Sequence, residues 1–186
     1  MISDTISEQL RLPKIGQLGY VVPDVNEGIA YCREVLGIKP WMLLDEKPEP
    51  CLQYGKDVHI RLKIALAYAG PVQIELIQVI EGESLHLDHL AKTEGILHHL
   101  GFMVQDVGKR LEECRRLGIG VLQRGTIRDA GFTVDYAYLD TVAPAGIILE
   151  LIQWRLGPIS LPVNKLVFNA VCRAGSRTLF RGRVIN

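Results

Sequence analysis

The chain has 186 residues, 48% of them hydrophobic, and its 21 lysine and arginine residues balance its 21 aspartate and glutamate residues. This length suits one domain with a substantial core, while the balanced charge provides no overall field for attracting nucleic acid or an anionic membrane. No apolar run reaches the ~18 residues of a membrane span and the first residues lack the apolar stretch of a secretory signal, so we expect a cytoplasmic protein.

A strand followed by a helix opens the predicted structure. The β-branched and aromatic run from Ile15 to Val22 predicts a buried strand. Asp24 then stands where a helix N-cap is expected, and apolar residues recur at helical spacing up to Gly37, at the position that commonly ends a helix. Three strand-like segments follow, at residues 41–45, 58–68 and 72–79.

The same order of elements returns after a polar connection at residues 80–95, for which we expect one turn of helix. His86 and His89 in this connection are interpreted as solvated loop residues rather than as a surface metal site. The second set comprises a strand at 97–104, a helix capped by Asp106 and ended by Gly118, and strands at 120–128, 132–140 and 147–153.

The two sets are copies of one unit. An offset of 82 residues places QLGYVVPDV over HLGFMVQDV, with Gln17 over His99, and the segment ELIQ closes both copies. The sequence therefore predicts an α+β domain at 14–153 built from two tandem βαβββ modules, 14–79 and 96–153, joined by 80–95. An N-terminal extension (1–13) and a basic C-terminal extension (154–186) flank this domain.

The two extensions and the cysteines carry no recognisable motif. We interpret the basic C-terminal extension as a solvated or partner-packed segment rather than a phosphate-binding one. The chain has four cysteines but no CxxC pair, which argues against a zinc-thiolate site or a disulfide framework.

Four polar residues interrupt the apolar strands at equivalent positions of the two copies: Gln17, Glu75, His99 and Glu150. Buried carboxylates need a compensating charge, yet no lysine or arginine recurs at equivalent strand positions. One divalent cation balances two carboxylates beside an imidazole and an amide, and this ligand set suits zinc, nickel, cobalt, manganese or iron. The alternative is that the glutamates face solvent on edge strands while Gln17 and His99 are satisfied core residues.

Two further histidines lie on the predicted strands. His98 precedes His99 and, by strand alternation, is expected to point to the opposite face, as a packing or supporting residue. His59 alternates with Arg61 and Lys63, which is compatible with either an exposed or a site-facing position.

The segments QLGYVV, IELIQ, HHLGFMV and LELIQ, together with the duplication, resemble the vicinal oxygen chelate (glyoxalase, bleomycin-resistance and dioxygenase) superfamily over residues 14–153. The resemblance implies a cupped mixed sheet with helices outside and a metal inside, held by Gln17, Glu75, His99 and Glu150. The segment running from residue 82 into the His98-His99 pair looks most like methylmalonyl-CoA epimerases. The ligand order is similar to that of some glyoxalase I enzymes, although Val21 and Val79 replace their expected arginine and asparagine.

The resemblance also implies a reaction: removal of a proton next to a carbonyl, with the metal stabilising the resulting negative oxygen. Glu150 is the first candidate for the base, and Asp57 and His59 are the nearest candidates for a second acid or base. We therefore expect an epimerase-like isomerase or lyase acting on a small carbonyl compound or acyl thioester, in a homodimer. The alternatives are a lactoylglutathione lyase and a non-catalytic protein that binds a small molecule such as an antibiotic.

Overall fold

The computed structural model describes residues 8–45, 49–93, 97–129, 132–175 and 183–185. Its elements are β1 (Gln17–Val21), α2 (Val25–Leu36), β2 (Trp41–Asp45), β3 (Glu49–Gln53), β4 (Lys56–Ala69), β5 (Val72–Glu81), α3 (Leu85–Thr93), β6 (Leu97–Met103), α4 (Val107–Arg116), β7 (Val121–Asp129), β8 (Phe132–Leu139), α5 (Val142–Ala145), β9 (Ile148–Leu156), β10 (Ile159–Leu161), α6 (Lys165–Gly175) and β11 (Arg183–Ile185). Among these described helices, none combines the length and the hydropathy that crossing a membrane requires.

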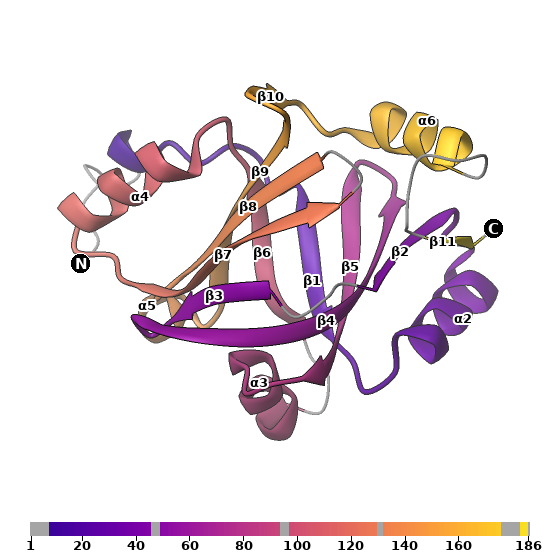
Figure 1. Ribbon diagram of the computed structural model, residues 1–186, viewed down its shortest axis with the longest axis horizontal. Helices are drawn as coiled ribbons and strands as arrows, with labels where there is room; N and C mark the ends of the chain where they lie inside the picture. Colours follow the sequence, from indigo (N-terminus) through magenta and orange to yellow (C-terminus); the bar gives the residue numbers. More distant parts are fainter. Residues whose placement is uncertain (1–7, 46–48, 94–96, 130–131, 176–182, 186) are drawn as a thin grey trace.

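The strands form one strongly curved sheet (Figure 1). Its order is β4-β3-β7-β8-β9-β6-β1-β5, and it closes because the long strand β4 pairs with both β3 and β5. The pairs β1–β5 and β6–β9 are parallel and the other pairs are antiparallel. The predicted α+β fold with a cupped mixed sheet is confirmed.

Both predicted copies of the unit are present, with one addition. The elements β1-α2-β2-β4-β5 and β6-α4-β7-β8-β9 follow the predicted order β-α-β-β-β. Strand β3 was not predicted, because its EPCLQ sequence contains a proline and has no β-branched residue. It forms a hairpin with β4 and also pairs with β7, so it joins the two halves of the barrel.

The repeated helices begin in the same way in both modules. Asp24 accepts hydrogen bonds from the amides of Asn26 and Glu27, and Asp106 accepts one from Lys109, as expected for N-caps. The glutamines of the two ELIQ segments complete these caps. Gln78 Oε1 accepts from the Val25 amide at 3.2 Å, and Gln153 Oε1 accepts from the Val107 amide at 3.1 Å.

Both repeated helices pack on the outside of the sheet. The buried residues of α2 contact Trp41, Ala65 and Leu76 of the first module. Those of α4 contact Ala137 and Leu151 of the second. Helix burial thus uses the outward-pointing residues of each strand, and the inward-pointing residues remain free to line the cup.

The described part of the C-terminal extension packs against the barrel rather than extending into solvent. Strand β10 pairs with β9 and strand β11 with β2. Between them, Phe168 and Cys172 of α6 are buried against inward-pointing residues such as Met42 and Leu66. The basic residues of the extension did not predict this packing, because the packing depends on the apolar residues that lie between them.

Candidate metal centre

The four polar residues singled out in the strands meet inside the barrel. Strand register pairs Gln17 with Gly101 and Gly19 with both His99 and Glu75, while Gly101 pairs with Glu150, so all four side chains point to one face. His99 Nε2 lies 3.0 Å from Glu150 Oε2, 3.2 Å from Glu75 Oε2 and 3.3 Å from Gln17 Oε1. All four residues are buried.

Two glycines make this convergence possible. Each lies two residues after a polar residue, in the segments QLG and HLG, and the antiparallel pairing of β1 with β6 sets each polar side chain over the other strand's glycine. A Cβ atom at Gly19 would stand 1.9 Å from Cε1 of His99, and one at Gly101 would stand 2.8 Å from Oε1 of Gln17. The side chains of His99 and Gln17 therefore occupy the space that any larger residue would need.

The oxygens around His99 outnumber the hydrogen-bond donors and cationic side chains that the protein places beside them. Three oxygens surround one nitrogen that carries at most one proton, and apart from that proton Oε2 of Glu75 and Oε2 of Glu150 have no hydrogen-bond donor among the described residues. None of the described residues lining the adjacent cavity is lysine or arginine. Ligands bound at right angles about 2.1 Å from one ion lie about 3.0 Å apart, close to the separations seen here. The donor atoms of Glu75, His99 and Glu150, all within 4.8 Å of one another, thus fit a divalent ion.

The electrostatics of the centre follow from burial and from the two carboxylates. Burial by itself would lower the pKa of His99, but the neighbouring Glu150 and Glu75 carboxylates raise it to about 10. Burial also raises the pKa of Glu150, while His99 and a hydrogen bond from Tyr138 oppose that rise. Without a metal ion, a protonated His99 therefore balances part of the negative charge. An ion bound at Nε2 must replace that proton.

His98 lies beside His99 rather than on the opposite face, so the prediction from strand alternation was wrong. A register shift between Gly19 and Tyr20 in the β1–β6 pair marks a bulge, where two residues of β6 oppose one of β1. The Nδ1 atoms of His98 and His99 are 2.9 Å apart. Burial and the surrounding histidines lower the pKa of His98, so it is neutral and accepts the Nδ1 proton of His99. That bond leaves Nε2 of His99 directed at the carboxylates, as in metal sites where a second group orients the histidine.

A buried chain of hydrogen bonds reaches Glu150 from the other side. Ser84 Oγ lies 2.5 Å from His86 Nδ1, His86 Nε2 lies 3.3 Å from the Tyr138 hydroxyl, and that hydroxyl bonds to Glu150. His86 is fully buried and its pKa is lowered to about 3, mainly by burial. The interpretation of His86 as a solvated residue was wrong, because the connection forms the nine-residue helix α3, which covers the end of the barrel (Figure 1).

The remaining sequence candidates lie elsewhere. Asp57 and His59 are exposed on β4 and are absent from the residues described around the cavity. Another pair was missed: Gln73, which accepts a hydrogen bond from Gln17 Nε2 at 2.9 Å, and Tyr138. Gln73 lies two residues before Glu75, so strand alternation was the signal available for it, whereas Tyr138 reaches the site through the pairing of β8 with β9.

A cavity of about 50 Å³ opens beside the carboxylates, room for a few waters or a small ligand group. Glu75, Glu150 and Gln17 form its polar end, with the hydroxyl-bearing Tyr136 and Tyr138 nearby. The rest of its wall is hydrophobic. The centre therefore places two acidic groups and an imidazole at the closed end of an otherwise apolar cup.

Comparisons with known proteins agree with this architecture. The model of the Glyoxalase/Bleomycin resistance protein/Dioxygenase superfamily matches residues 16–138. Methylmalonyl-CoA epimerase from Mycobacterium tuberculosis is 16% identical, with a TM-score of 0.56 over 82% of this chain and 91% of that one. A hypothetical protein from Bacillus halodurans is 19% identical, with a TM-score of 0.55 over 75% and 92%.

A further structure, of methylmalonyl-CoA epimerase in complex with methylmalonyl-CoA and ammonium, is 18% identical, with a TM-score of 0.52 over 81% of this chain and 99% of that one. At these identities the likeness concerns the fold. No curated protein sequence matches the chain.

Proposed function

Because the chain belongs to the Glyoxalase/Bleomycin resistance protein/Dioxygenase superfamily, we propose that it is a metal-dependent isomerase or lyase that removes a proton next to a carbonyl group. One observation carries this proposal. Two buried carboxylates, of Glu75 and Glu150, converge with an amide oxygen on His99 Nε2, whose single proton is the only donor that faces both Oε2 atoms among the described residues. Buried ionised groups in that state are costly unless a cation compensates them.

Gln17, Glu75, His99 and Glu150 are the residues that would hold the ion, with zinc, nickel, cobalt, manganese and iron as candidates. When bound, such an ion acts as a Lewis acid that stabilises negative charge on a substrate oxygen. The surrounding residues support this role by fixing the donors. Gln73 orients the amide of Gln17, and His98 orients the ring of His99.

Glu150 is the proposed base. Burial raises the pKa of its carboxylate in the metal-free centre, and a buried carboxylate that is not bound to the ion is a stronger proton acceptor than a solvated glutamate. The Tyr138 hydroxyl bonds to this carboxylate, which lines the cavity with its Oε2 atom 3.0 Å from His99 Nε2. Glu75 comes from the other module and provides a second carboxylate, whereas Asp57 and His59 are exposed on β4 and are not among the residues described around the cavity.

The proposed substrate is a small carbonyl compound or an acyl thioester, with epimerase-like chemistry. Structural neighbours named as methylmalonyl-CoA epimerases support the thioester. A lactoylglutathione lyase finds less support, because Val21 and Val79 stand where that enzyme's arginine and asparagine are expected. A protein that only sequesters a ligand gives no reason for two buried carboxylates.

Metal analysis and proton exchange test the proposal. After reconstitution, we expect about one equivalent of metal per chain, lost in a His99→Ala variant but retained in His59→Ala. The loaded protein should exchange the α-proton of an acyl-CoA for deuterium in deuterium oxide, followed by nuclear magnetic resonance. Less than half an equivalent of metal, or full loading without exchange in a panel of acyl-CoAs and the methylglyoxal-glutathione adduct, would contradict it.

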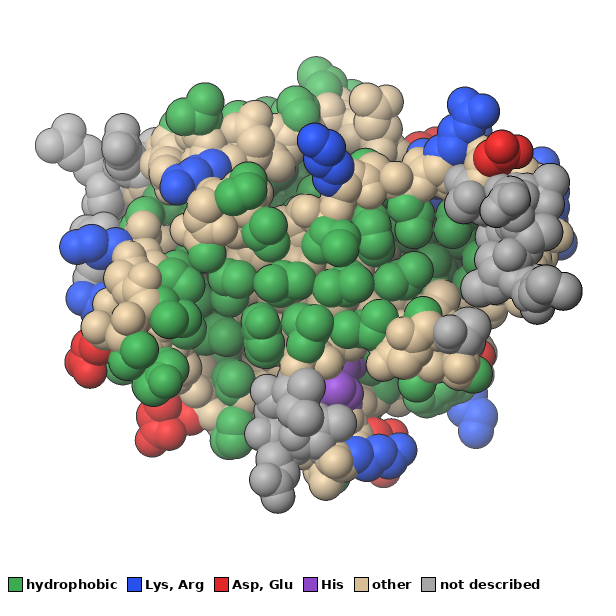
Figure 2. Space-filling model, turned by 180° about the vertical axis from the view of Figure 1, so that it is seen from behind, with side chains coloured by type: hydrophobic (Ala, Val, Ile, Leu, Met, Phe, Trp, Pro, Cys, Tyr) green, Lys and Arg blue, Asp and Glu red, His purple; other side chains and the backbone are tan. Residues whose placement is uncertain are grey.

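We also propose that the protein is a homodimer. Strands β1, β5 and β6 lie at the back in Figure 1, and hydrophobic side chains gather across this rear face in Figure 2. On strands β1 and β6, Leu18 and Leu100 pair directly, are half-exposed and are absent from the clusters that the two repeated helices form. Apolar surface of this kind is typical of subunit contacts. Light scattering should give twice the chain mass for the wild type and the monomer mass for Leu18→Lys.

A further inference from the structure

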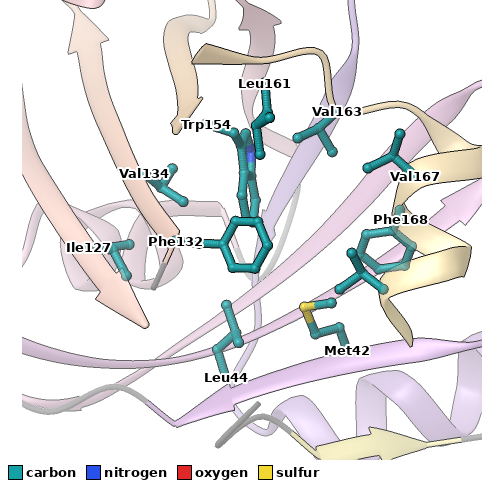
Figure 3. A pocket seen from close by; sticks show the side chains of 11 residues that line it. Met42, Leu44, Ile127, Phe132, Val134, Trp154, Leu161, Val163, Val167 and Phe168 are labelled. Carbon is teal, nitrogen blue, oxygen red and sulfur yellow. The ribbon is translucent and has the colours of Figure 1, made fainter. Parts of the chain in front are cut away.

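The C-terminal segment after β9 builds a second pocket against the mouth of the barrel (Figure 3). Met42, Leu44 and Phe132 come from the barrel, and further wall residues come from the segment itself: Leu161, Val163, Val167, Phe168 and Val171. The family match ends at residue 138, so these wall residues lie beyond it. The outer wall of the pocket is thus built from residues outside the matched region.

This pocket adjoins the cavity at the carboxylates. The two share four wall residues: Leu44, Ile127, Val134 and Trp154. A molecule with its carbonyl oxygen at the Glu75–Glu150 end would therefore direct the rest of its body along these side chains into the pocket. The inner cavity and the pocket are thus adjacent along these four side chains.

The segment that forms the outer wall is held in place. The Phe168 ring meets the Tyr68 ring edge-on, with centroids 5.3 Å apart, and Phe168 and Cys172 are buried. The Tyr68 hydroxyl donates to the backbone oxygen of Val163 at 3.4 Å, and β10 pairs with β9 just before the segment. These contacts make the wall a built part of the fold.

The chemistry of the wall selects an uncharged group. All eleven residues described around the pocket are hydrophobic. The part of the acyl chain next to the carbonyl carbon would face Glu75 and Glu150, and neither the pocket nor the inner cavity has a lysine or arginine among its described residues. A carboxylate on the acyl chain would leave water for a wall that offers it no cationic side chain. One polar atom is available: Trp154 Nε1 is buried without a hydrogen-bond partner among the described residues, and Figure 3 shows it on the side of Leu161.

Size narrows the choice further. The pocket has about 50 Å³ of free space, compared with about 150 Å³ for a protein cavity that binds benzene. A branched or straight chain of a few carbons fits this volume better than an aromatic ring does. Resting on the function proposed above, we propose that the substrate is a thioester of a short, uncharged aliphatic acid, whose acyl chain enters the pocket closed by the C-terminal segment.

Two thioesters of matched shape test this assignment. Isobutyryl-CoA and methylmalonyl-CoA share one carbon skeleton and differ in a methyl group against a carboxylate. Calorimetry on the metal-loaded full chain should show isobutyryl-CoA binding at least about tenfold more tightly. Equal binding, or tighter binding of methylmalonyl-CoA, would overturn the inference.

Neighbouring positions on α6 provide the matched variants. Val167 lines the pocket and is 39% exposed, whereas Leu166 is 81% exposed and outside it, so both positions tolerate a polar residue. Val167→Asp should weaken isobutyryl-CoA binding at least tenfold, and Leu166→Asp should leave it within twofold. Val167→Lys should improve methylmalonyl-CoA binding, a gain that misfolding cannot produce. Unchanged binding in both Val167 variants would refute the pocket assignment.

The outcome separates the two proposals, since binding preference and proton exchange are measured independently. Exchange of the α-proton together with a preference for methylmalonyl-CoA would reject the aliphatic acyl group and keep the proposed function. A preference for isobutyryl-CoA without exchange of either thioester would support the pocket and reject the chemistry.

Discussion

The two modules carry their glutamates on equivalent strands but surround them differently. Glu150 of β9 pairs with Tyr138, whereas Glu75 of β5 pairs with Leu66. Two residues further along each strand, Ile152 pairs with Tyr136 and Ile77 with Ile64. Duplication thus reproduces the backbone and the carboxylate, while the neighbouring strand decides whether that carboxylate has a hydrogen-bond donor beside it. At these matched positions the second module places two tyrosine hydroxyls in the cavity wall, and the first module places only aliphatic side chains there.

The largest expected effect comes from removing the two carboxylates in turn. Glu150→Gln should lower the rate of α-proton exchange by about 1000-fold, because a general base contributes on that order. Glu75→Gln should cost markedly less at equal metal content, since Leu66 beside it provides no hydroxyl. Exchange rates are compared after both variants are loaded and their metal is quantified. Equal losses would show that the modules are functionally equivalent.

The paired glycines offer the next comparison. Gly19→Ala sets a Cβ within the His99 ring, so we expect about 3 kcal/mol of lost stability and loss of stoichiometric metal. Gly101→Ala meets Cβ and Oε1 of Gln17 and Cδ1 of Ile152 at 2.8 Å, a milder overlap than 1.9 Å, and should cost about 1 kcal/mol. Urea unfolding and metal analysis measure both. Similar behaviour of the two variants would contradict the tighter packing assigned to His99.

Acid sensitivity is expected from the helix that joins the modules. His86 is neutral in the fold because its pKa is lowered to about 3, while the unfolded chain binds a proton near pH 6.5. The stability that neutral His86 allows is therefore present in full above pH 6.5. As the pH falls toward 3, protonation of His86 in the unfolded chain lowers the free energy of unfolding, by about 2 kcal/mol at pH 5.

A His86→Leu variant removes this titration, so its unfolding free energy should fall less than that of the wild type between pH 7.5 and pH 5. His89→Leu, on the same helix but only half-buried, provides the control. If the unfolding free energy of His86→Leu fell by as much as that of the wild type between pH 7.5 and pH 5, groups other than His86 would be responsible for the acid sensitivity.

The smallest effect concerns the hydroxyl that distinguishes the modules. Tyr138→Phe should reduce exchange about tenfold, the value of one hydrogen bond to a charged group. Tyr136→Phe is the matched control, because its hydroxyl accepts from Gln123 at 3.3 Å rather than bonding to Glu150. Both variants should bind metal normally. An equal loss of exchange rate in Tyr136→Phe would contradict the assignment of this effect to the hydrogen bond between Tyr138 and Glu150.

Internal repetition is the reason that so much was predictable. Gln17 and His99 share one position of the unit and Glu75 and Glu150 another, so strand alternation and the duplication together indicated that all four face one cavity. Prediction failed where the pattern is interrupted. The bulge at His98 breaks alternation, and strand β3 has a composition that local propensity does not favour.

By itself, the sequence determined the two modules, their capped helices and the four convergent polar residues, because each rests on short-range periodicity repeated at a fixed offset. Tertiary structure alone decided that His86 and Tyr138 reach Glu150 and that α6 closes an apolar pocket at the mouth of the barrel. Those contacts join segments far apart in the chain, and only the closure of the sheet and the docking of its ends bring them together.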